Sequence, residues 1–284
     1  MLWQPRDKLK TQVVYTIKGL KMSNTYTLIK GRIPVLISMP HNGEALPAYI
    51  ANKMTEQGKK VADTDWHKDK LYAFAQALGA YIIMPKYSRY VIDLNRDPEG
   101  VDLYPGANST ELCPTTSFDL SPLYLDGENP DQAEIKHRVN TYWQPYHQAL
   151  KATLIDIQAE FGKAVLLEAH SILSKVPRFF EGQLPDFNFG TADGKSCDPE
   201  LLVALQNLDY SPYSMITNGR FKGGFITRQY GDPEKNIHAV QLELSQRTYM
   251  QEPSCEYNEA LAAEVIPKLE QLVQTLIQFS QQKD

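Results

Sequence analysis

Two histidines stand at the ends of two similar apolar segments, a pattern that can bring metal ligands together. His41 follows "VLISMP" and His170 ends "KAVLLEAH", and both segments have the continuous aliphatic character of strands that are covered on both faces. In an open α/β sheet, ligands bind beyond the carboxyl ends of the strands. Neutral imidazoles with one carboxylate are a common ligand set for catalytic zinc. We therefore expect His41 and His170 to hold one metal ion.

Two acidic residues are alternative third ligands. Glu44 follows His41 by three residues and could bind the same ion from one tight turn. Asp65 lies in "ADTDWHKD" and could bind the metal or orient a ligand histidine by hydrogen bonding. The alternative interpretations are a polar turn for the first segment and helix capping by the aspartates for the second. Spacing alone leaves the choice open.

Glu243 is the candidate general base. It lies in the late apolar segment "HAVQLEL", where a buried carboxylate is costly unless it has a partner or a catalytic task. Beside an activated water it would accept a proton. The alternative is a half-exposed strand glutamate.

Two clusters of basic residues are candidates for binding carboxylates. "SRYVIDLNRD" contains Arg89, Asn95 and Arg96, and "NGRFKGGFITRQYGD" contains Arg220 and Arg228 around a Gly-Gly pair. A guanidinium group makes two charge-assisted hydrogen bonds to a carboxylate, and an amide can add a third. Two separate clusters would suit a small-molecule dicarboxylate substrate. The alternatives are a salt-bridged surface and a turn.

The elements that must position these residues alternate between strands and helices. Helices are expected over residues 47–57, 67–79, 131–160 with a bend near Pro145, 199–208 and 258–278; strands are expected over 33–39, 81–85, 89–94, 163–169, 213–218 and 238–244. Residues 97–130 and 177–200 are rich in Gly, Pro and polar residues and predict long loops. The alternation indicates an α/β protein with a mixed, mostly parallel central sheet. With no clear domain boundary, residues 1–284 are expected to form a single catalytic domain, with 1–30 as an N-terminal extension packed on the core.

Composition excludes several classes of function. The 284 residues carry a net charge of -5 with a pI near 5.7, which argues against nucleic acid and anionic membranes as partners. No apolar run approaches the roughly 20 residues of a membrane span and the first residues lack a secretory signal, so we expect a cytoplasmic protein. The three cysteines show no CxxC spacing. The sequence has no GxSxG, GxxxxGK[ST] or GxGxxG motif, which weakens serine hydrolase, kinase and dehydrogenase interpretations.

Several segments together resemble the N-formylglutamate amidohydrolase (N-formylglutamate deformylase) family. They run in order from about residue 33 to 251: "SMPHNGEALP", "DTDWHKDKLY", "SRYVIDLNRDP", "LLEAHSI", "LPDFNFGTADGKSC", "FKGGFITRQYG" and "VQLELSQRTYM". The resemblance implies a three-layer fold related to the zinc carboxypeptidases and aspartoacylase (phosphorylase/hydrolase-like). It also implies hydrolysis of N-formyl-L-glutamate to L-glutamate and formate, the last step of one route of histidine degradation.

The resemblance also implies roles for particular residues. One zinc ion per chain would be held by His41 and His170 together with an acidic residue. Glu44 matches the acid of a His-x-x-Glu pattern, while the Asp-Thr-Asp-Trp-His block, a hallmark of the family, makes Asp65 its rival.

By the same resemblance, Glu243 matches the general base and Arg89 the arginine that stabilises the oxyanion. Asn95 and Arg96 match a pair that binds a substrate carboxylate. Arg220 and Arg228 remain candidates for the second carboxylate.

Two other functions remain open. The first is a related zinc hydrolase that acts on another N-acylated acidic amino acid or on a peptidoglycan amide. The second is a non-catalytic module that binds dicarboxylates or senses metal. The sequence does not specify the native metal, the oligomeric state, or whether residues 97–130 close over the substrate.

Overall fold

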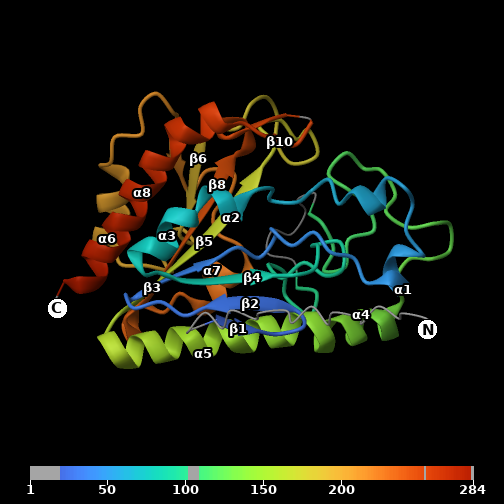
Figure 1. Ribbon diagram of the computed structural model, residues 1–284, viewed down its shortest axis with the longest axis horizontal. Helices are drawn as coiled ribbons and strands as arrows, with labels where there is room; N and C mark the ends of the chain where they lie inside the picture. The colour runs from blue at the N-terminus through green and yellow to red at the C-terminus, as the bar shows by residue number, and fades with distance from the viewer. Residues whose placement is uncertain (1–19, 102–108, 253, 283–284) are drawn as a thin grey trace, which may run out of the picture.

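An eight-stranded sheet runs through the middle of the protein (Figure 1). The structure, a computed structural model, describes residues 20–101, 109–252 and 254–282. The strand order is β1-β2-β4-β3-β5-β8-β6-β7. The strands span β1 Leu20–Met22, β2 Tyr26–Ile29, β3 Val35–Ser38, β4 Tyr81–Pro85, β5 Ala164–Ile172, β6 Phe187–Gly190, β7 Met215–Thr217 and β8 Ile237–Ser245, and β9 (Met250–Gln251) and β10 (Glu256–Tyr257) form a separate hairpin.

The four central strands β4, β3, β5 and β8 are parallel to one another. β2 and β6 join them antiparallel, one on each side, and β1 and β7 extend the two edges. β5 is buried over its whole length, as its unbroken aliphatic sequence predicts for a strand covered on both faces. The expected mixed, mostly parallel sheet is confirmed.

Helices cover both faces of the sheet and complete three layers (Figure 1). One face packs against α5 (Gln144–Phe161) and α7 (Phe225–Tyr230); the other packs against α3 (Ala73–Leu78), α6 (Pro199–Gln206) and α8 (Glu259–Gln281). The remaining elements are α1 (Ala48–Ala51), α2 (Lys68–Leu71), α4 (Gln132–Arg138), a π-helical turn at Val139–Trp143, and short 3-10 turns at Gly58–Lys60, Pro233–Lys235 and Gln246–Thr248. The expected three-layer α/β fold is confirmed.

Several local predictions were wrong. Residues 89–94 form turns rather than a strand, because β4 is already paired on both sides, with β2 and β3, and offers no free edge. Helix 47–57 shrinks to the single turn α1. β6 lies inside the stretch 177–200 that was expected to be a loop, and α7 starts at the Gly-Gly pair, for which a turn was one alternative interpretation.

The N-terminal extension lies partly outside the described residues, which begin at Leu20; from there β1 and β2 add to the sheet edge beside β4. One sheet joins strands from Leu20 to Ser245, and the single domain expected for residues 1–284 stays a prediction. In the described part of the chain, no helix is both long and apolar enough to cross a bilayer. A cytoplasmic location stays a prediction.

Candidate active site

His41 lies just past β3, at the carboxyl edge of the sheet, where its ring is buried. The turn that follows passes so close to the backbone of Tyr87 that a Cβ on Gly43 would lie 2.3 Å from the Tyr87 carbonyl oxygen. Only glycine fits this approach. Nε2 of His41 lies 2.6 Å from Oδ1 of Asp93, which favours a proton on Nε2 and turns the unprotonated Nδ1 toward the interior of the site.

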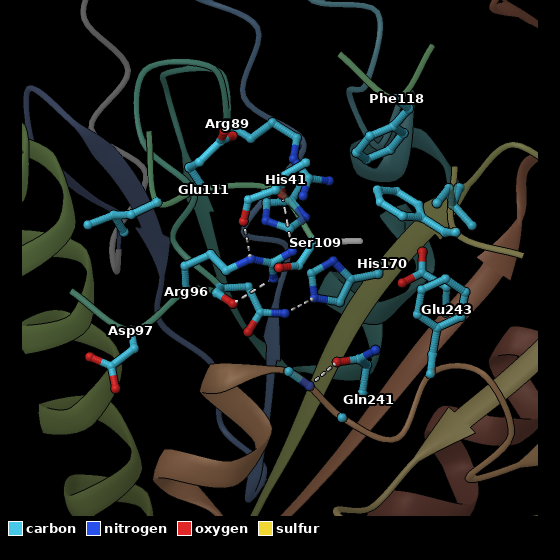
Figure 2. A pocket seen from close by; sticks show the side chains of 18 of the residues that line it. His41, Arg89, Arg96, Asp97, Ser109, Glu111, Phe118, His170, Gln241 and Glu243 are labelled. Carbon is cyan, nitrogen blue, oxygen red and sulfur yellow. Dashed lines mark hydrogen bonds between the residues drawn. The ribbon is translucent and has the colours of Figure 1, made fainter. Parts of the chain in front are cut away.

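His170 belongs to β5 itself, two residues before its end. Its Nε2 lies 2.6 Å from Oε1 of Glu168, so this histidine, too, has a carboxylate on Nε2, and its Nδ1 is directed to Asp65. Glu168 is held in turn by the backbone N–H of Thr227 at 3.1 Å. The two imidazole rings lie side by side with their centroids 4.7 Å apart (Figure 2).

Asp65 joins the two histidines, whereas Glu44 does not. The backbone N–H of Asp65 donates to the carbonyl of His41 at 3.0 Å, which ties the two loops together. Its carboxylate lies 3.2 Å from Nδ1 of His170 and 4.0 Å from Nδ1 of His41. Glu44 is exposed to solvent and lies outside this cluster. The structure therefore favours Asp65 of the two alternatives.

The aspartates of this segment do not cap α2. Its N-cap residue is His67, which makes no side-chain cap hydrogen bond. Instead, Asp65 accepts a hydrogen bond from the Ser171 N–H at 3.0 Å and Asp63 accepts one from the Phe118 N–H at 2.8 Å. Both carboxylates are used for tertiary contacts around the site, so the capping interpretation was wrong.

The residues present fit a metal ion. The potential ligand atoms of His41, Asp65 and His170 lie within 4.8 Å of one another, and Nδ1 of His41 is buried without a hydrogen-bond partner among the described residues. An unpaired polar atom in such a place is costly unless something binds it. We call these three residues the metal cluster.

Carboxyl groups outnumber cationic side chains among the buried groups around the metal cluster. Four buried carboxyl groups contact the two histidines or lie beside them, against two buried cations; the carboxyl groups are those of Asp65, Asp93, Glu168 and Glu243, and the cations are Lys68 and Arg89. Burial by itself disfavours a charged imidazole, but Glu168 and Asp65 outweigh it and raise the pKa of His170 to about 10. The site thus favours added positive charge, which a bound cation would supply.

Glu243 is placed beside His170 by the register of the sheet. The two residues are direct neighbours on the parallel strands β8 and β5, so their side chains share one face. The Glu243 carboxyl lines the cavity and is 8% exposed (Figure 2). Burial raises its pKa to about 7, which is close to the value expected of a group that must both take up and release a proton near neutral pH.

Arg89 lines the same cavity with its charge fixed by Asp93. Its Nη2 donates to Oδ2 of Asp93 at 2.6 Å, and its guanidinium carbon lies 4.9 Å from the ring centre of Phe118. Burial opposes the charge, but Asp93 and Asp65 outweigh burial and raise the pKa of Arg89. Arg89 therefore stays a cation that can stabilise negative charge forming near the cluster.

The cavity has a volume of about 350 Å³ and opens over the metal cluster. Arg96 and Arg220 line it (Figure 2 shows Arg96). Arg96 donates from Nε to the Thr110 carbonyl at 3.1 Å, and Arg220 donates from Nε to the Phe179 carbonyl at 2.6 Å. We call these two residues the arginine rim. Arg96 also donates from Nη1 to the Asn95 carbonyl at 3.2 Å and from Nη2 to the Thr110 hydroxyl at 3.1 Å. A guanidinium has five N–H groups, so Arg96 keeps one on each Nη for a ligand carboxylate.

The other two predicted carboxylate-binding residues are engaged by the protein. Arg228 lies in α7, outside the cavity lining, and its Nε donates to the Gly223 carbonyl at 2.9 Å. Asn95 lines the cavity, but its Oδ1 accepts from the Ile226 N–H at 2.9 Å and its Nδ2 lies 3.1 Å from Nε2 of His170. A Cβ on Gly224 would lie 2.2 Å from this amide. Asn95 is thus wedged between the metal cluster and α7.

Sequence reasoning missed three residues that support the cluster. Asp93 and Glu168 orient the two histidines, and buried Lys68 donates from Nζ to the His170 carbonyl at 2.9 Å. Burial lowers the pKa of Lys68 to about 8. The available signal was a charged residue inside an apolar segment, as for Glu168 in "AVLLEAHS", because such a group is buried only with partners.

Comparisons with known proteins show the family of this chain. The family model described as N-formylglutamate amidohydrolase matches residues 33–250. The chain belongs to the N-formylglutamate amidohydrolase family. The chain is similar to the N-formylglutamate deformylase of Pseudomonas putida, at 46% identity over 92% of this chain and 99% of that protein. It is 44% identical, over the same shares, to the N-formylglutamate deformylase of Pseudomonas aeruginosa.

Two solved structures share the fold of this family member. The N-formylglutamate amidohydrolase from Ralstonia eutropha JMP134 superimposes with a TM-score of 0.77 at 24% identity, covering 90% of this chain and 97% of that one. A gene product from Agrobacterium tumefaciens gives a TM-score of 0.69 at 17% identity, covering 90% and 96%. At these identities the likeness concerns the fold.

Proposed function

We propose that this protein is a zinc-dependent amidohydrolase that cleaves N-formyl-L-glutamate to L-glutamate and formate, as a step of histidine degradation. The observation that carries the proposal is the metal cluster, which lies beside a carboxyl suited to proton transfer in a cavity with three arginines. The relatives named N-formylglutamate deformylase, at 44% and 46% identity, support the choice of substrate. Two imidazole nitrogens and one carboxylate support the choice of zinc.

The metal would be held by His41, Asp65 and His170. When bound, a zinc ion acts as a Lewis acid on the formyl carbonyl and lowers the pKa of water toward about 7. Asp93 and Glu168 hold the Nε2 protons of the two histidines at 2.6 Å. They therefore keep each Nδ1 unprotonated and aimed at the ion.

Glu243 supplies the proton transfers of the reaction. Its carboxylate takes a proton from the attacking water and returns it to the nitrogen of the departing glutamate, so that the C–N bond breaks and formate is released. The guanidinium of Arg89 faces the negative charge that develops on the formyl oxygen, a contribution worth roughly 3 kcal/mol in comparable sites. The group that transfers protons and the group that stabilises the negative charge thus line the same cavity.

The arginine rim would select the dicarboxylate. We propose that Arg96 and Arg220 each bind one carboxylate of the substrate, which fixes the formyl group over the cluster. Asn95 contributes through its position between Arg96 and His170 rather than through a free amide. Arg228 is kept as a weaker candidate because its guanidinium lies outside the cavity lining.

The proposal is tested on the purified wild-type chain. We expect about one zinc per chain by mass spectrometry and release of formate from N-formyl-L-glutamate, measured with a coupled formate assay. Parallel assays with N-formyl-L-aspartate, N-acetyl-L-glutamate and N-acetyl-L-aspartate test the substrate. Absence of both zinc and formate would contradict the proposal, and faster turnover of an N-acetyl substrate would reassign it within the same reaction class.

A further inference from the structure

The segment that carries Asn95 and Arg96 is irregular and depends on its neighbours for its shape. Residues 94–96 form turns between the buried carboxylate of Asp93 and the loop that starts at residue 97. The Asn95 N–H donates to Oδ1 of Asp93 at 2.8 Å, which fixes one end of the segment. The Arg96 guanidinium is itself fixed by Thr110, to whose carbonyl and hydroxyl it donates at 3.1 Å, and the backbone of the segment needs support of its own to keep it in register with a substrate. Its carbonyl groups show what holds the rest.

Two aromatic side chains bind the carbonyls of this segment. Nε1 of Trp143 donates to the Arg96 carbonyl at 3.1 Å, and Nε2 of His147 donates to the Leu94 carbonyl at 2.8 Å. The rings of Trp143 and His147 are stacked, with centroids 3.6 Å apart and an interplanar angle of 16°. Neither lies among the residues that line the cavity. The pair therefore acts on the backbone behind Arg96, not on a ligand.

The helix is distorted at the point where it presents these rings. Residues Val139–Trp143 form a π-helical turn between α4 and α5, and Pro145 follows in the first turn of α5. Pro145 has no N–H to donate to the carbonyl four residues earlier, which explains why the regular helical pattern breaks here. Single π-turns inside helices occur frequently at functional sites. The structure thus has a π-helical turn where the sequence predicts a bend, and Trp143 is the last residue of that turn.

The state of His147 is set by a third contact. Its Nδ1 lies 2.8 Å from the Tyr230 hydroxyl, which donates to it and leaves the proton on Nε2 for the Leu94 carbonyl. Burial lowers the pKa of His147 to about 4, so the ring is neutral at ordinary pH. Tyr230 ends α7, whose first turn donates the Ile226 N–H to the Asn95 side chain. α5 and α7 thus brace the same three residues from two sides.

We propose that Trp143 and His147 are positioning residues for substrate binding, which hold the backbone of residues 94–96 so that Arg96 meets a substrate carboxylate. The inference rests on the proposed function only in taking Arg96 as a carboxylate-binding residue. It adds a pair that no substrate atom touches. Because the pair bonds the carbonyls of Leu94 and Arg96 and itself contacts no residue of the metal cluster, its loss should weaken binding more than it slows the chemical step.

The test is a double-mutant cycle between Trp143→Phe and Arg96→Ala. Trp143→Phe keeps an aromatic ring to stack on His147 and removes the indole N–H that donates to the Arg96 carbonyl, together with part of the ring. We expect KM for N-formyl-L-glutamate to rise about tenfold, with kcat within about twofold, since one well-placed charge-assisted contact is misaligned. In the Arg96→Ala background, the same change should alter kcat/KM by less than about twofold.

Three controls make the outcome decisive. Tyr210→Phe removes a similar bond, from a buried aromatic side chain to the Leu205 carbonyl at 2.9 Å, far from the cavity, and should leave KM unchanged. His147→Gln, whose amide can still donate near the position of Nε2, should retain more affinity than His147→Leu.

An unchanged KM in Trp143→Phe, or an equal loss in both backgrounds, would overturn the inference, as would a matching loss in Tyr210→Phe. Failure of the wild-type chain to release formate would instead overturn the proposed function, and the inference with it.

Discussion

The metal cluster and the arginine rim face the same cavity but are built from different parts of the fold. His41 and His170 come from the end of β3 and from within β5, and each is fixed by a carboxylate at 2.6 Å. Arg96 and Arg220 come from loops and are fixed mainly by backbone carbonyls. The reacting groups are thus positioned by the sheet and the binding groups by loops. Substitutions should abolish activity in the cluster and give graded losses at the rim.

The largest effect is expected in the metal cluster, from Asp65→Asn. The change keeps the shape of the side chain and removes the charge that joins the two histidines. Loss of an outer partner of a metal ligand already costs about 10- to 100-fold, so we expect near-complete loss of bound zinc and more than about a 1,000-fold loss of activity. Glu44→Gln is the matched control and should keep zinc content and activity. A zinc-free Glu44→Gln with a zinc-loaded Asp65→Asn would reverse the assignment.

A somewhat smaller loss is expected at Glu243, which separates metal binding from proton transfer. Glu243→Gln should retain zinc and lower kcat by about 10²- to 10⁴-fold. Because the base acts as a carboxylate and burial raises its pKa to about 7, wild-type kcat/KM should fall as the pH drops through this region. A bound cation favours the ionised form of Glu243 and would move the acidic limb of the pH profile below pH 7. Normal turnover in Glu243→Gln, with the acidic limb of its pH profile unchanged, would exclude Glu243 as the base.

The smallest effect is expected at the arginine rim. Arg220→Gln should raise KM for N-formyl-L-glutamate by about 10- to 100-fold, the cost of one charge-assisted contact, with kcat nearly unchanged. Arg228→Gln is the matched control, since Arg228 lies outside the cavity lining, and its KM should change by less than about threefold. Steady-state formate assays on both variants decide between them. A larger KM change in Arg228→Gln than in Arg220→Gln would indicate that the second carboxylate of the substrate binds at α7.

The sequence predicts the groups positioned by the sheet better than those positioned by loops. His41 and His170 follow unbroken aliphatic segments, and such segments in an α/β chain predict parallel strands with ligands at their carboxyl ends. Glu243 was predicted for the same reason. The choice between Asp65 and Glu44 as the third ligand was left open. The position of Asp65 depends on a backbone hydrogen bond to His41, a residue 24 positions earlier. No local pattern encodes that bond.

Errors in the fold have a similar cause. The segment 89–94 has the composition of a strand, and its apolar residues are buried, yet both edges of β4 are taken by β2 and β3. Strand propensity reports how well a residue fits a sheet surface and carries no information on whether an edge is free. β6 was missed because it is short and lies among glycines and prolines, where pairing with β8 outweighs local preference. The supporting Trp143 and His147 bind through contacts across the fold, which no spacing reveals.

The pairing of His170 with Glu243 across β5 and β8 fixes the spacing between these two residues. Hydrogen-bonded strands lie about 4.8 Å apart, whatever side chains they carry. The separation of a metal ligand from the base is therefore a property of the backbone, and neighbouring substitutions cannot readily retune it. An aspartate at position 243 would be one methylene too short, and no loop movement could make up the difference. The reaction geometry is thus as durable as the sheet, while the choice of substrate remains free to change in the loops.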